Sequence, residues 1–387
     1  MNASELLEII QMGESSKVQF KLRVNNANSI AAEMVAFSNT KGGLIIIGID
    51  DKTGQINGLS FEELQVTNEL LANAASNNVK APIYIYTETV KVKEQNIIIA
   101  HISEGASKPH MDNNGTIWVK NGSDKRKVVA KEELARLLQS SGNLYADETV
   151  VNGTSIDDID EKAFRVFVQK KLEKSIDDLD LTMPELLSNL GLMKNGNLTL
   201  GGLLMFGKEP QKFRPTFTVH CMAFKGLDIA TSVYQNKKEP FEGNLRSVYE
   251  QTLAFIIQNL KEVQVEEDFN SLGQLEIPKV TLQELLVNAL VHRDYFINSS
   301  IKVFVFNDRV EIISPGKLPN TLTIENIKTG TSVIRSPILY SNVPYILPFQ
   351  GVGSGIRRAF SKHQDIELVN DTDRELFIAI IKRPDLD

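Results

Sequence analysis

The sequence predicts an α+β protein with two or three domains. Its 387 residues are more than a single compact core usually holds. Apolar residues recur at helical spacing from Leu282 to Leu290, which predicts an amphipathic helix. An unbroken apolar run at 44–49 and an alternating run at 301–306, each followed by turn residues, predict strands. These observations together give the mixed fold class.

The composition favours a globular protein of the cytoplasm. Hydrophobic residues make up 42% and charged residues 24% of the chain, which is ordinary for globular domains. The single cysteine, Cys221, leaves no intramolecular disulfide and fits a reducing compartment. Residues 1–11 predict an amphipathic helix rather than a signal peptide, and no apolar run approaches the roughly 20 residues that span a membrane. A net charge of −7 argues against a protein that coats nucleic acid over its whole surface.

The N-terminal third contains the elements of a small domain. A helix is predicted over 29–37 and a buried strand over 44–49. Further strands are predicted over 83–92, 96–102 and 116–120. The tetrapeptide TKGG at 40–43 lacks the Walker spacing, so a glycine turn into a strand is expected there rather than a phosphate loop.

Three stretches of this region, FK at 20–21, AFSNTKGGLIIIGIDD and WVKNGS, resemble the Schlafen/AlbA-like domain. The resemblance runs from about Glu14 to Leu138, and we expect an AlbA-like α/β domain over 1–142. It implies nucleic-acid binding and, as in some Schlafens, RNA cleavage by acidic residues that hold a metal.

The acids that match the nuclease members are Glu14 and either Asp50 or Asp51. Gln19 stands where those members have a glutamate, and a neutral amide binds Mg²⁺ less well than a carboxylate. Acids that cap turns or face solvent are the alternative interpretation, and the resemblance therefore implies nucleic-acid contact more strongly than cleavage.

Basic residues with small polar neighbours predict contacts to phosphate oxygens that do not read sequence. The candidates near a turn at 121–124 are Lys120, Lys125, Arg126 and Lys127. A second set comprises Lys17, Lys21, Arg23 and Lys41. Trp118 could stack on a base or lie buried in its strand. A charged turn that only solvates the fold is the alternative.

The middle region, 143–270, is mixed in character. A helix is predicted over 183–190, followed by a second helix or by a wing-like hairpin around 194–197. No basic recognition helix accompanies this pair. The stretch LTLGGLLMFGKEPQ resembles the segment between the two domains of a regulator family, and the five histidines show no metal-ligand spacing.

The predicted helix that includes 284–295 carries two polar side chains that a packing helix does not need. Glu284 and Asn288 lie four residues apart, so they project from the same side. A carboxylate that orients water beside an amide oxygen that binds Mg²⁺ suits a nucleotide site. A polar edge on an ordinary packing helix is the alternative.

The segments that follow this helix favour a phosphate site. Strands are predicted over 301–306 and 310–313, after which SPGKLP is expected to break the sheet. The run GVGSG at 351–355 opens a predicted helix that continues through Phe360. Glycines before a helix let backbone N–H groups approach phosphate oxygens at its positive end, although a tight turn or cap is the alternative.

In this order, the segments resemble the GHKL ATPase fold of gyrase, a heat-shock chaperone family and histidine kinases. They resemble more closely its RecG-like C-terminal, or HATPase-like, branch in predicted bacterial transcriptional regulators, through the motifs NAL-HRDY, DR-EI-SPG-LP and G-GSGI-R. The resemblance covers about 281–382 and implies a GHKL-like α/β sandwich over 271–387, with ATP and Mg²⁺ as ligands. It implies Glu284 as the water-orienting base, Asn288 as the Mg²⁺ ligand and a phosphate loop of Gly351, Gly353 and Gly355.

Other positions depart from the family pattern. Ser314, followed by Pro315 and Gly316, stands roughly where the usual fold has the aspartate that receives the adenine amino group. A hydroxyl carries no charge, so its bond to that amino group should be weaker. Arg335 lies in IRSP, where the family often has SRNP in its lid, and could meet a phosphate or face solvent. Adenine selectivity and hydrolysis are therefore left open.

The sequence as a whole predicts a DNA-binding transcriptional regulator that forms homo-oligomers and whose C-terminal domain binds ATP and Mg²⁺ as a conformational signal. Two alternatives are open. One is an enzyme, either a slow ATPase or a Schlafen-like metal-dependent nuclease, and the other is a non-catalytic dimerisation scaffold. The family often carries a winged helix after the ATPase-like domain, and the sequence does not decide whether one follows Asp387.

Overall fold

The computed structural model describes residues 1–142, 144–230, 233–263, 273–319, 322–349 and 353–384. The chain divides into two compact units, Met1–Leu144 and Tyr145–Asp387. The domain boundaries expected at 142/143 and 270/271 adjoin or fall within stretches outside the described residues. The middle region packs within the second unit.

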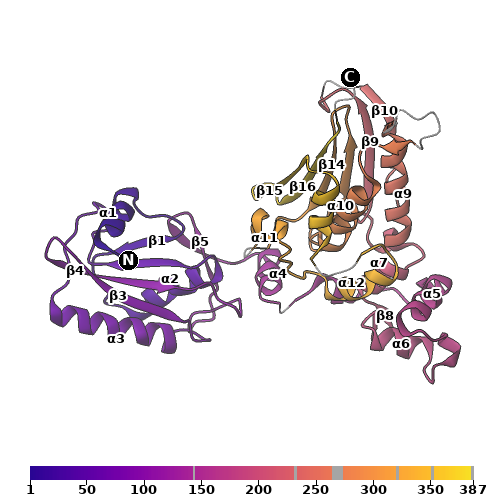
Figure 1. The fold of residues 1–387 in the computed structure, drawn as a ribbon. Coiled ribbons are helices and arrows are strands. Elements are labelled where there is room, and N and C mark those ends of the chain that lie inside the picture. Colours follow the sequence, from indigo (N-terminus) through magenta and orange to yellow (C-terminus); the bar gives the residue numbers. More distant parts are fainter. Residues whose placement is uncertain (143, 231–232, 264–272, 320–321, 350–352, 385–387) are drawn as a thin grey trace. The chain divides into compact units, whose positions relative to one another are not determined.

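The first unit is built around a four-stranded sheet of order β1-β2-β4-β3 (Figure 1). β1 and β2 are parallel, and the other neighbours are antiparallel. One face packs against α2 and α3, and the opposite face receives Leu6 of α1. The elements are α1 (Ala3–Met12), β1 (Val18–Lys21), α2 (Ala27–Asn39), β2 (Gly43–Ile47), α3 (Phe61–Asn77), β3 (Ile85–Val92), β4 (Gln95–Ile102), β5 (Trp118–Asn121), β6 (Asp124–Lys127) and α4 (Lys131–Ser140).

Local sequence signals explain where these elements begin. Asn26 caps α2, and Ser60 forms a capping box with Glu63 at the start of α3, so backbone N–H groups that lack a partner in the helix are satisfied. The isoleucines at 45–47 are fully buried, which confirms the predicted apolar strand. The predicted turn at 121–124 joins β5 and β6 as a hairpin.

The second unit begins with short helices and a small hairpin. They are η1 (Ala146–Glu148), η2 (Ile156–Asp158), α5 (Glu161–Leu172), η3 (Ile176–Asp178), α6 (Met183–Asn189), β7 (Met193–Lys194), β8 (Asn197–Leu198), α7 (Leu200–Phe206) and α8 (Pro210–Phe213). The middle region therefore contains a helix, a hairpin and another helix where the sequence left a helix pair or a wing-like hairpin open.

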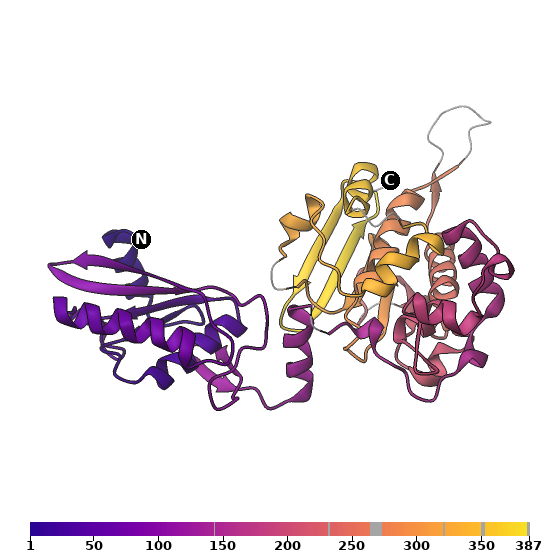
Figure 2. The ribbon, with the colours of Figure 1, turned by 90° about the horizontal axis from the view of Figure 1, so that it is seen from below.

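A six-stranded sheet of order β10-β9-β13-β14-β16-β15 forms the rest of this unit (Figure 2). β9 and β13 are parallel, and the other neighbours are antiparallel. The elements are β9 (Val219–Lys225), β10 (Val233–Lys237), α9 (Leu245–Gln258), β11 (Glu262–Val263), β12 (Gln274–Leu275), α10 (Lys279–His292), β13 (Ile301–Val305), β14 (Arg309–Pro315), α11 (Ile324–Lys328), α12 (Pro337–Asn342), η4 (Val343–Tyr345), α13 (Gly355–Lys362), β15 (Ile366–Asp371) and β16 (Leu376–Lys382).

The predicted apolar side of α10 is confirmed. Its members are all buried in one core with residues of the sheet, α9 and α13: Leu282, Leu285, Leu286, Ala289 and Leu290. The strand ends within SPGKLP as expected, but β14 continues through Pro315 and pairs with β16 there, two residues beyond the predicted strand end at 313. A proline is tolerated as the last residue of a strand because little of the hydrogen-bond ladder lies beyond it. Within the described ranges, no helix is both long and apolar enough to cross a membrane.

Candidate functional site

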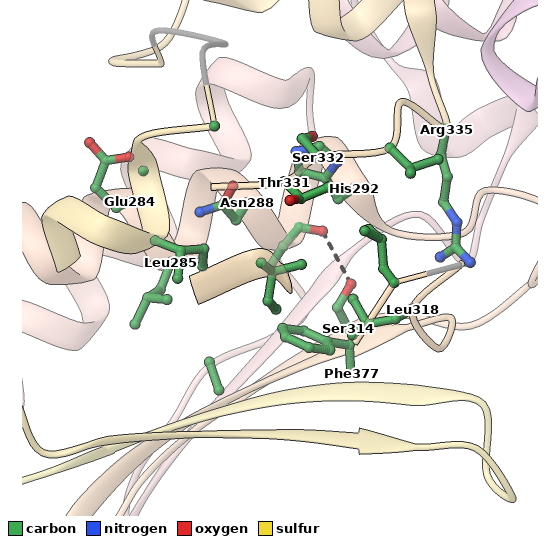
Figure 3. Close-up of a pocket in the computed structure, with 18 of the residues that line it drawn as sticks. Glu284, Leu285, Asn288, His292, Ser314, Leu318, Thr331, Ser332, Arg335 and Phe377 are labelled. Atoms are coloured by element: carbon green, nitrogen blue, oxygen red, sulfur yellow. Dashed lines mark hydrogen bonds between the residues drawn. The ribbon is translucent and has the colours of Figure 1, made fainter. Parts of the chain in front are cut away.

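A pocket in the second unit brings the C-terminal candidates together (Figure 3). It has an empty volume of ≈ 1050 Å³, including space open to solvent, which is room for a ligand of nucleotide size. α10, β14, the segments 316–319 and 322–335, and the start of α13 supply most of its walls. The sequence-predicted residues that line it are Glu284, Asn288, Ser314, Gly316, Arg335, Gly353 and Gly355. Gly351 lies outside the described residues.

Polar side chains on α10 face the pocket at four-residue intervals. Glu284, Asn288 and His292 all line it, so each follows the previous one by about 6 Å along the helix. From the sequence, His292 was tested only as one of five possible metal ligands. Its position four residues after Asn288 was the signal that could have placed it in the site.

The start of α13 lies directly on the acidic end of this row. A Cβ atom added to Gly355 would fall 2.6 Å from Glu284 Oε2 and 3.3 Å from Asn288 Nδ2. A Cβ on Gly353, where φ is +67°, would overlap the carbonyl oxygen of Gly330. Gly355 therefore lets the start of α13 approach α10 closely, and Gly353 lets the backbone just before α13 approach Gly330.

Glu284 is held by an ion pair. Its Oε1 lies 2.5 Å from Nη2 of Arg358 on α13, and its side chain is only 6% exposed. Burial raises the pKa of the Glu284 carboxyl, and the nearby Arg358 guanidinium acts in the opposite direction. The carboxylate expected to orient water is thus already bound by a cation.

Hydrogen-bond donors without a partner surround this end of the pocket. Asn288 Nδ2, Ser354 Oγ and Arg358 Nε are buried and have no hydrogen-bond partner among the described residues. All of them line the pocket and all can donate. A buried polar group left unpaired costs about 1–3 kcal/mol, so this cluster favours a ligand that accepts hydrogen bonds. Ser354 and Arg358 were not among the predicted site residues.

Away from Glu284, the pocket is lined by Ser314, His292 and Arg335. Ser314 Oγ donates a hydrogen bond to the Ala289 carbonyl oxygen at 3.2 Å, so its lone pairs can accept from a ligand. Burial, with a smaller contribution from Arg335, lowers the pKa of His292 to about 4, which leaves the imidazole neutral at pH 7. Figure 3 shows Glu284 and Arg335 at opposite sides of the pocket.

Arg335 lies beside a glycine that the backbone requires. Gly316 has φ +104°, and a Cβ there would fall 2.5 Å from Asp294 Cβ and 2.9 Å from Arg335 Nη1. Burial lowers the pKa of the Arg335 guanidinium, against the raising effects of Asp294 and Glu375. Gly316 therefore lets Asp294 and the Arg335 guanidinium pack closely against the backbone of the pocket wall.

The basic hairpin of the first unit is largely engaged with the fold's own acids. Lys120 is buried at 9% exposure, and its Nζ donates to Gln19 Oε1 at 2.8 Å and to the Ser123 carbonyl. Lys125 Nζ lies 2.6 Å from Glu33 Oε1. The expectation that Lys120 is offered to phosphate on the surface is therefore wrong, because its ammonium group already has internal partners.

Of the remaining basic candidates, Lys21 and Arg23 are half-buried, and the others are exposed. Arg126 binds both carboxylate oxygens of Glu133, at 2.8 and 2.6 Å. Lys127 lies over the Trp118 ring, 5.4 Å from its centroid, and Lys41 is exposed at the turn before β2. Trp118 is partly buried, and its indole N–H donates to Asp112 Oδ2 at 2.8 Å.

The acids proposed for cleavage have local roles. Glu14 Oε1 accepts from Gln19 Nε2 at 2.6 Å and from the Phe20 N–H at 2.7 Å. Asp50 accepts from the backbone N–H groups of the turn at 52–53, which lowers its pKa. In the part of the chain that the structure describes, no group of three or more His, Cys, Asp or Glu residues is placed to hold a metal ion.

Comparison with protein families assigns separate family matches to the N-terminal and C-terminal parts of the chain. Residues 14–129 match the family "Schlafen, AlbA_2", and residues 298–376 match HATPase_c_4, described as "Putative ATP-dependent DNA helicase recG C-terminal". The chain joins a Schlafen/AlbA_2 domain to a RecG-related HATPase_c_4 domain. Between them, residues 135–220 match a domain of unknown function, DUF8451. Both resemblances inferred from the sequence motifs are confirmed. The HATPase_c_4 match begins after α10 and does not include Glu284 and Asn288, so their roles stay predictions.

Two solved structures are similar to this chain, one over nearly its whole length and one over about a third of it. The DIP2311 protein from Corynebacterium diphtheriae is 19% identical, with 98% of this chain and 80% of that chain covered and a TM-score of 0.46. The N-terminal domain of a RecG-related protein from Nitrosomonas europaea is 21% identical, with 34% of this chain and 96% of that chain covered and a TM-score of 0.26. No match to a curated protein was found.

Proposed function

We propose that the HATPase_c_4 pocket binds ATP with Mg²⁺, and that this binding is a conformational signal in a DNA-binding transcriptional regulator. The observation that carries the proposal is the cluster of buried, unpartnered donors on Asn288, Ser354 and Arg358. Phosphate oxygens are acceptors with negative charge, and the start of α13 adds backbone N–H groups that favour the same ligand.

Asn288 also fits a metal that accompanies the phosphates. The carboxamide carries an oxygen beside its N–H donor. That oxygen would be a ligand of Mg²⁺, which prefers oxygen donors, while Nδ2 donates to a phosphate. The metal would supply positive charge to the phosphates when bound.

Binding is favoured over turnover. A water-orienting base needs a free carboxylate oxygen, and because Arg358 binds Oε1 of Glu284, only Oε2 could act on water. Ser314 replaces a charged acceptor with a hydroxyl at the other end of the pocket. Slow ATP hydrolysis is the enzymatic alternative, and it would be seen as release of phosphate that stops when Glu284 is changed to Gln.

Calorimetric titration of the full chain with ATP and MgCl₂ tests the proposal. Asn288→Ala should weaken binding by about tenfold or more, because a hydrogen bond to a charged group contributes about 1.5–3 kcal/mol. Asn189→Ala is the matched control, since Asn189 is an exposed helical asparagine in the same unit and outside the pocket. Absence of binding by the parent protein would rule out the nucleotide signal.

A further inference from the structure

Two exposed tyrosines lie on the sheet of the Schlafen/AlbA_2 domain. Tyr84 is 77% exposed and Tyr86 is 56% exposed. Ile83 and Ile85 pack into the core that includes α2 and α3. Because side chains alternate across an extended chain, Tyr84 and Tyr86 project from the opposite face of the sheet.

A third ring extends this aromatic surface across the sheet. His101 of β4 is the cross-strand partner of Tyr86, and their ring centroids are 5.5 Å apart. The same row continues through Leu44 of β2 to Val18 of β1. Four neighbouring strands place the ends of this row about 14 Å apart. Leu44 and Val18 are half-buried against the core that contains Leu6 of α1, so the open part of the row is its Tyr86–His101 end.

The helix that covers this face does not extend over the tyrosines. Leu6 of α1 packs with Ile46, Ile99 and Val90 farther along the strands. His101 keeps 36% of its side chain exposed. The aromatic end of the face is thus open to a ligand, whereas its other end is core.

The charges around the open end are basic. Lys17 and Lys41 are exposed just before β1 and β2, at the end of the sheet where Tyr84 precedes β3. Neither lysine forms an ion pair with another described residue. The nearby acids are already paired, Glu88 with His101 at 2.7 Å and Glu104 with Lys108 at 2.5 Å.

We infer that Tyr84, Tyr86 and His101 form a stacking platform for single-stranded nucleic acid, with Lys17 and Lys41 contacting its phosphates. Aromatic rings stack on the face of any base, and this face is accessible in a single strand but not in a duplex. The lysines supply the salt-dependent part of the binding. This inference deepens the proposed nucleic-acid role and places it away from the β5–β6 hairpin, whose Lys120 and Lys125 are already paired with Glu33.

Fluorescence anisotropy of the full chain with a short labelled oligo-dT strand tests the inference. The double change Tyr84→Ala/Tyr86→Ala should weaken binding about tenfold or more, since stacking is worth about 1–3 kcal/mol per base. Tyr84→Phe/Tyr86→Phe keeps both rings and should bind within about twofold of the parent. Phe61→Ala is the control, because Phe61 is 78% exposed on α3 in the same unit.

The lysines are tested by salt dependence. Lys17→Ala/Lys41→Ala should lower the slope of log affinity against log salt by about 0.7 for each phosphate that the variant no longer neutralises. All of these side chains are exposed, and thermal unfolding of each variant should match the parent.

The outcomes separate this inference from the wider proposal. Unchanged oligo-dT binding by the Tyr84→Ala/Tyr86→Ala variant would overturn the platform. The platform would also be overturned if the protein bound duplex and lost that binding on neutralising Arg126 and Lys127 but not on changing the tyrosines. That result would assign the nucleic-acid role to the β5–β6 hairpin. Binding to neither strand nor duplex would remove both, and the ATP titration would still stand as an independent test.

Discussion

Replacing Gly355 with alanine gives a prediction whose sign depends on the geometry of the pocket. Alanine is a better helix former than glycine, and at Gly355, the first residue of α13, helix propensity alone predicts a gain of at most about 1 kcal/mol. The added Cβ, however, would lie 2.6 Å from Glu284 Oε2, and an ordinary contact begins near 3.4 Å. Glu284 would have to retreat by about 0.8 Å while buried and bound to Arg358. Such overpacking typically costs about 1–3 kcal/mol.

We therefore expect Gly355→Ala to lower the free energy of unfolding by about 1–2 kcal/mol, measured by urea denaturation. It should also weaken ATP·Mg binding by about tenfold or more, because the methyl group displaces the donors around Asn288. The same change made in a Glu284→Ala background removes the clash and should be neutral or stabilising. A stability gain from Gly355→Ala alone, with unchanged ATP binding, would refute the close approach of α13 to α10.

Other changes test the electrostatics of both units. Buried Asp147, whose Oδ2 accepts from the Leu339 N–H at 2.9 Å, has a pKa raised to about 7 by burial. Above pH 4 the carboxyl ionises in the unfolded protein but stays protonated in the folded protein. The free energy of unfolding should therefore fall by up to about 4 kcal/mol between pH 4 and 7. Urea denaturation of the parent and of Asp147→Asn should show this fall in the parent only. Arg358→Ala removes a donor and the partner of Glu284, and calorimetry should show ATP·Mg binding about tenfold weaker, whereas equal affinity would exclude Arg358 from the site. Lys120→Met leaves Glu33 with fewer partners and should lower the free energy of unfolding by about 3 kcal/mol. Lys127→Met, at an exposed position, should change it by less than about 0.5 kcal/mol. Equal thermal stability of the two variants would contradict the burial of Lys120.

Local patterns predicted the elements that carry the pocket. The apolar spacing of α10 fixed which side is buried, and the four-residue interval between Glu284 and Asn288 placed both on one wall. The glycines at 353 and 355 could be predicted because a backbone that closely approaches a neighbour requires residues without a side chain, and such glycines are visible in the sequence.

Contacts between distant segments were not predictable in the same way. Lys120 looked like a surface lysine because its partner Glu33 lies far away in sequence, on α2. The ion pair between Arg358 and Glu284 joins two helices whose approach no local pattern encodes. The parallel pairing of β9 with β13 depends on the packing of the whole second unit. Side-chain pairing across the fold, rather than periodicity, decides these features.

A structure of the full chain grown with Mg²⁺ and a non-hydrolysable ATP analogue would test the central claim most directly. We predict phosphate oxygens within hydrogen-bond distance of Asn288, Ser354 and Arg358, at the start of α13. Donors that bond only to water, with the analogue absent or held elsewhere on the chain, would contradict the assignment of this pocket to a nucleotide.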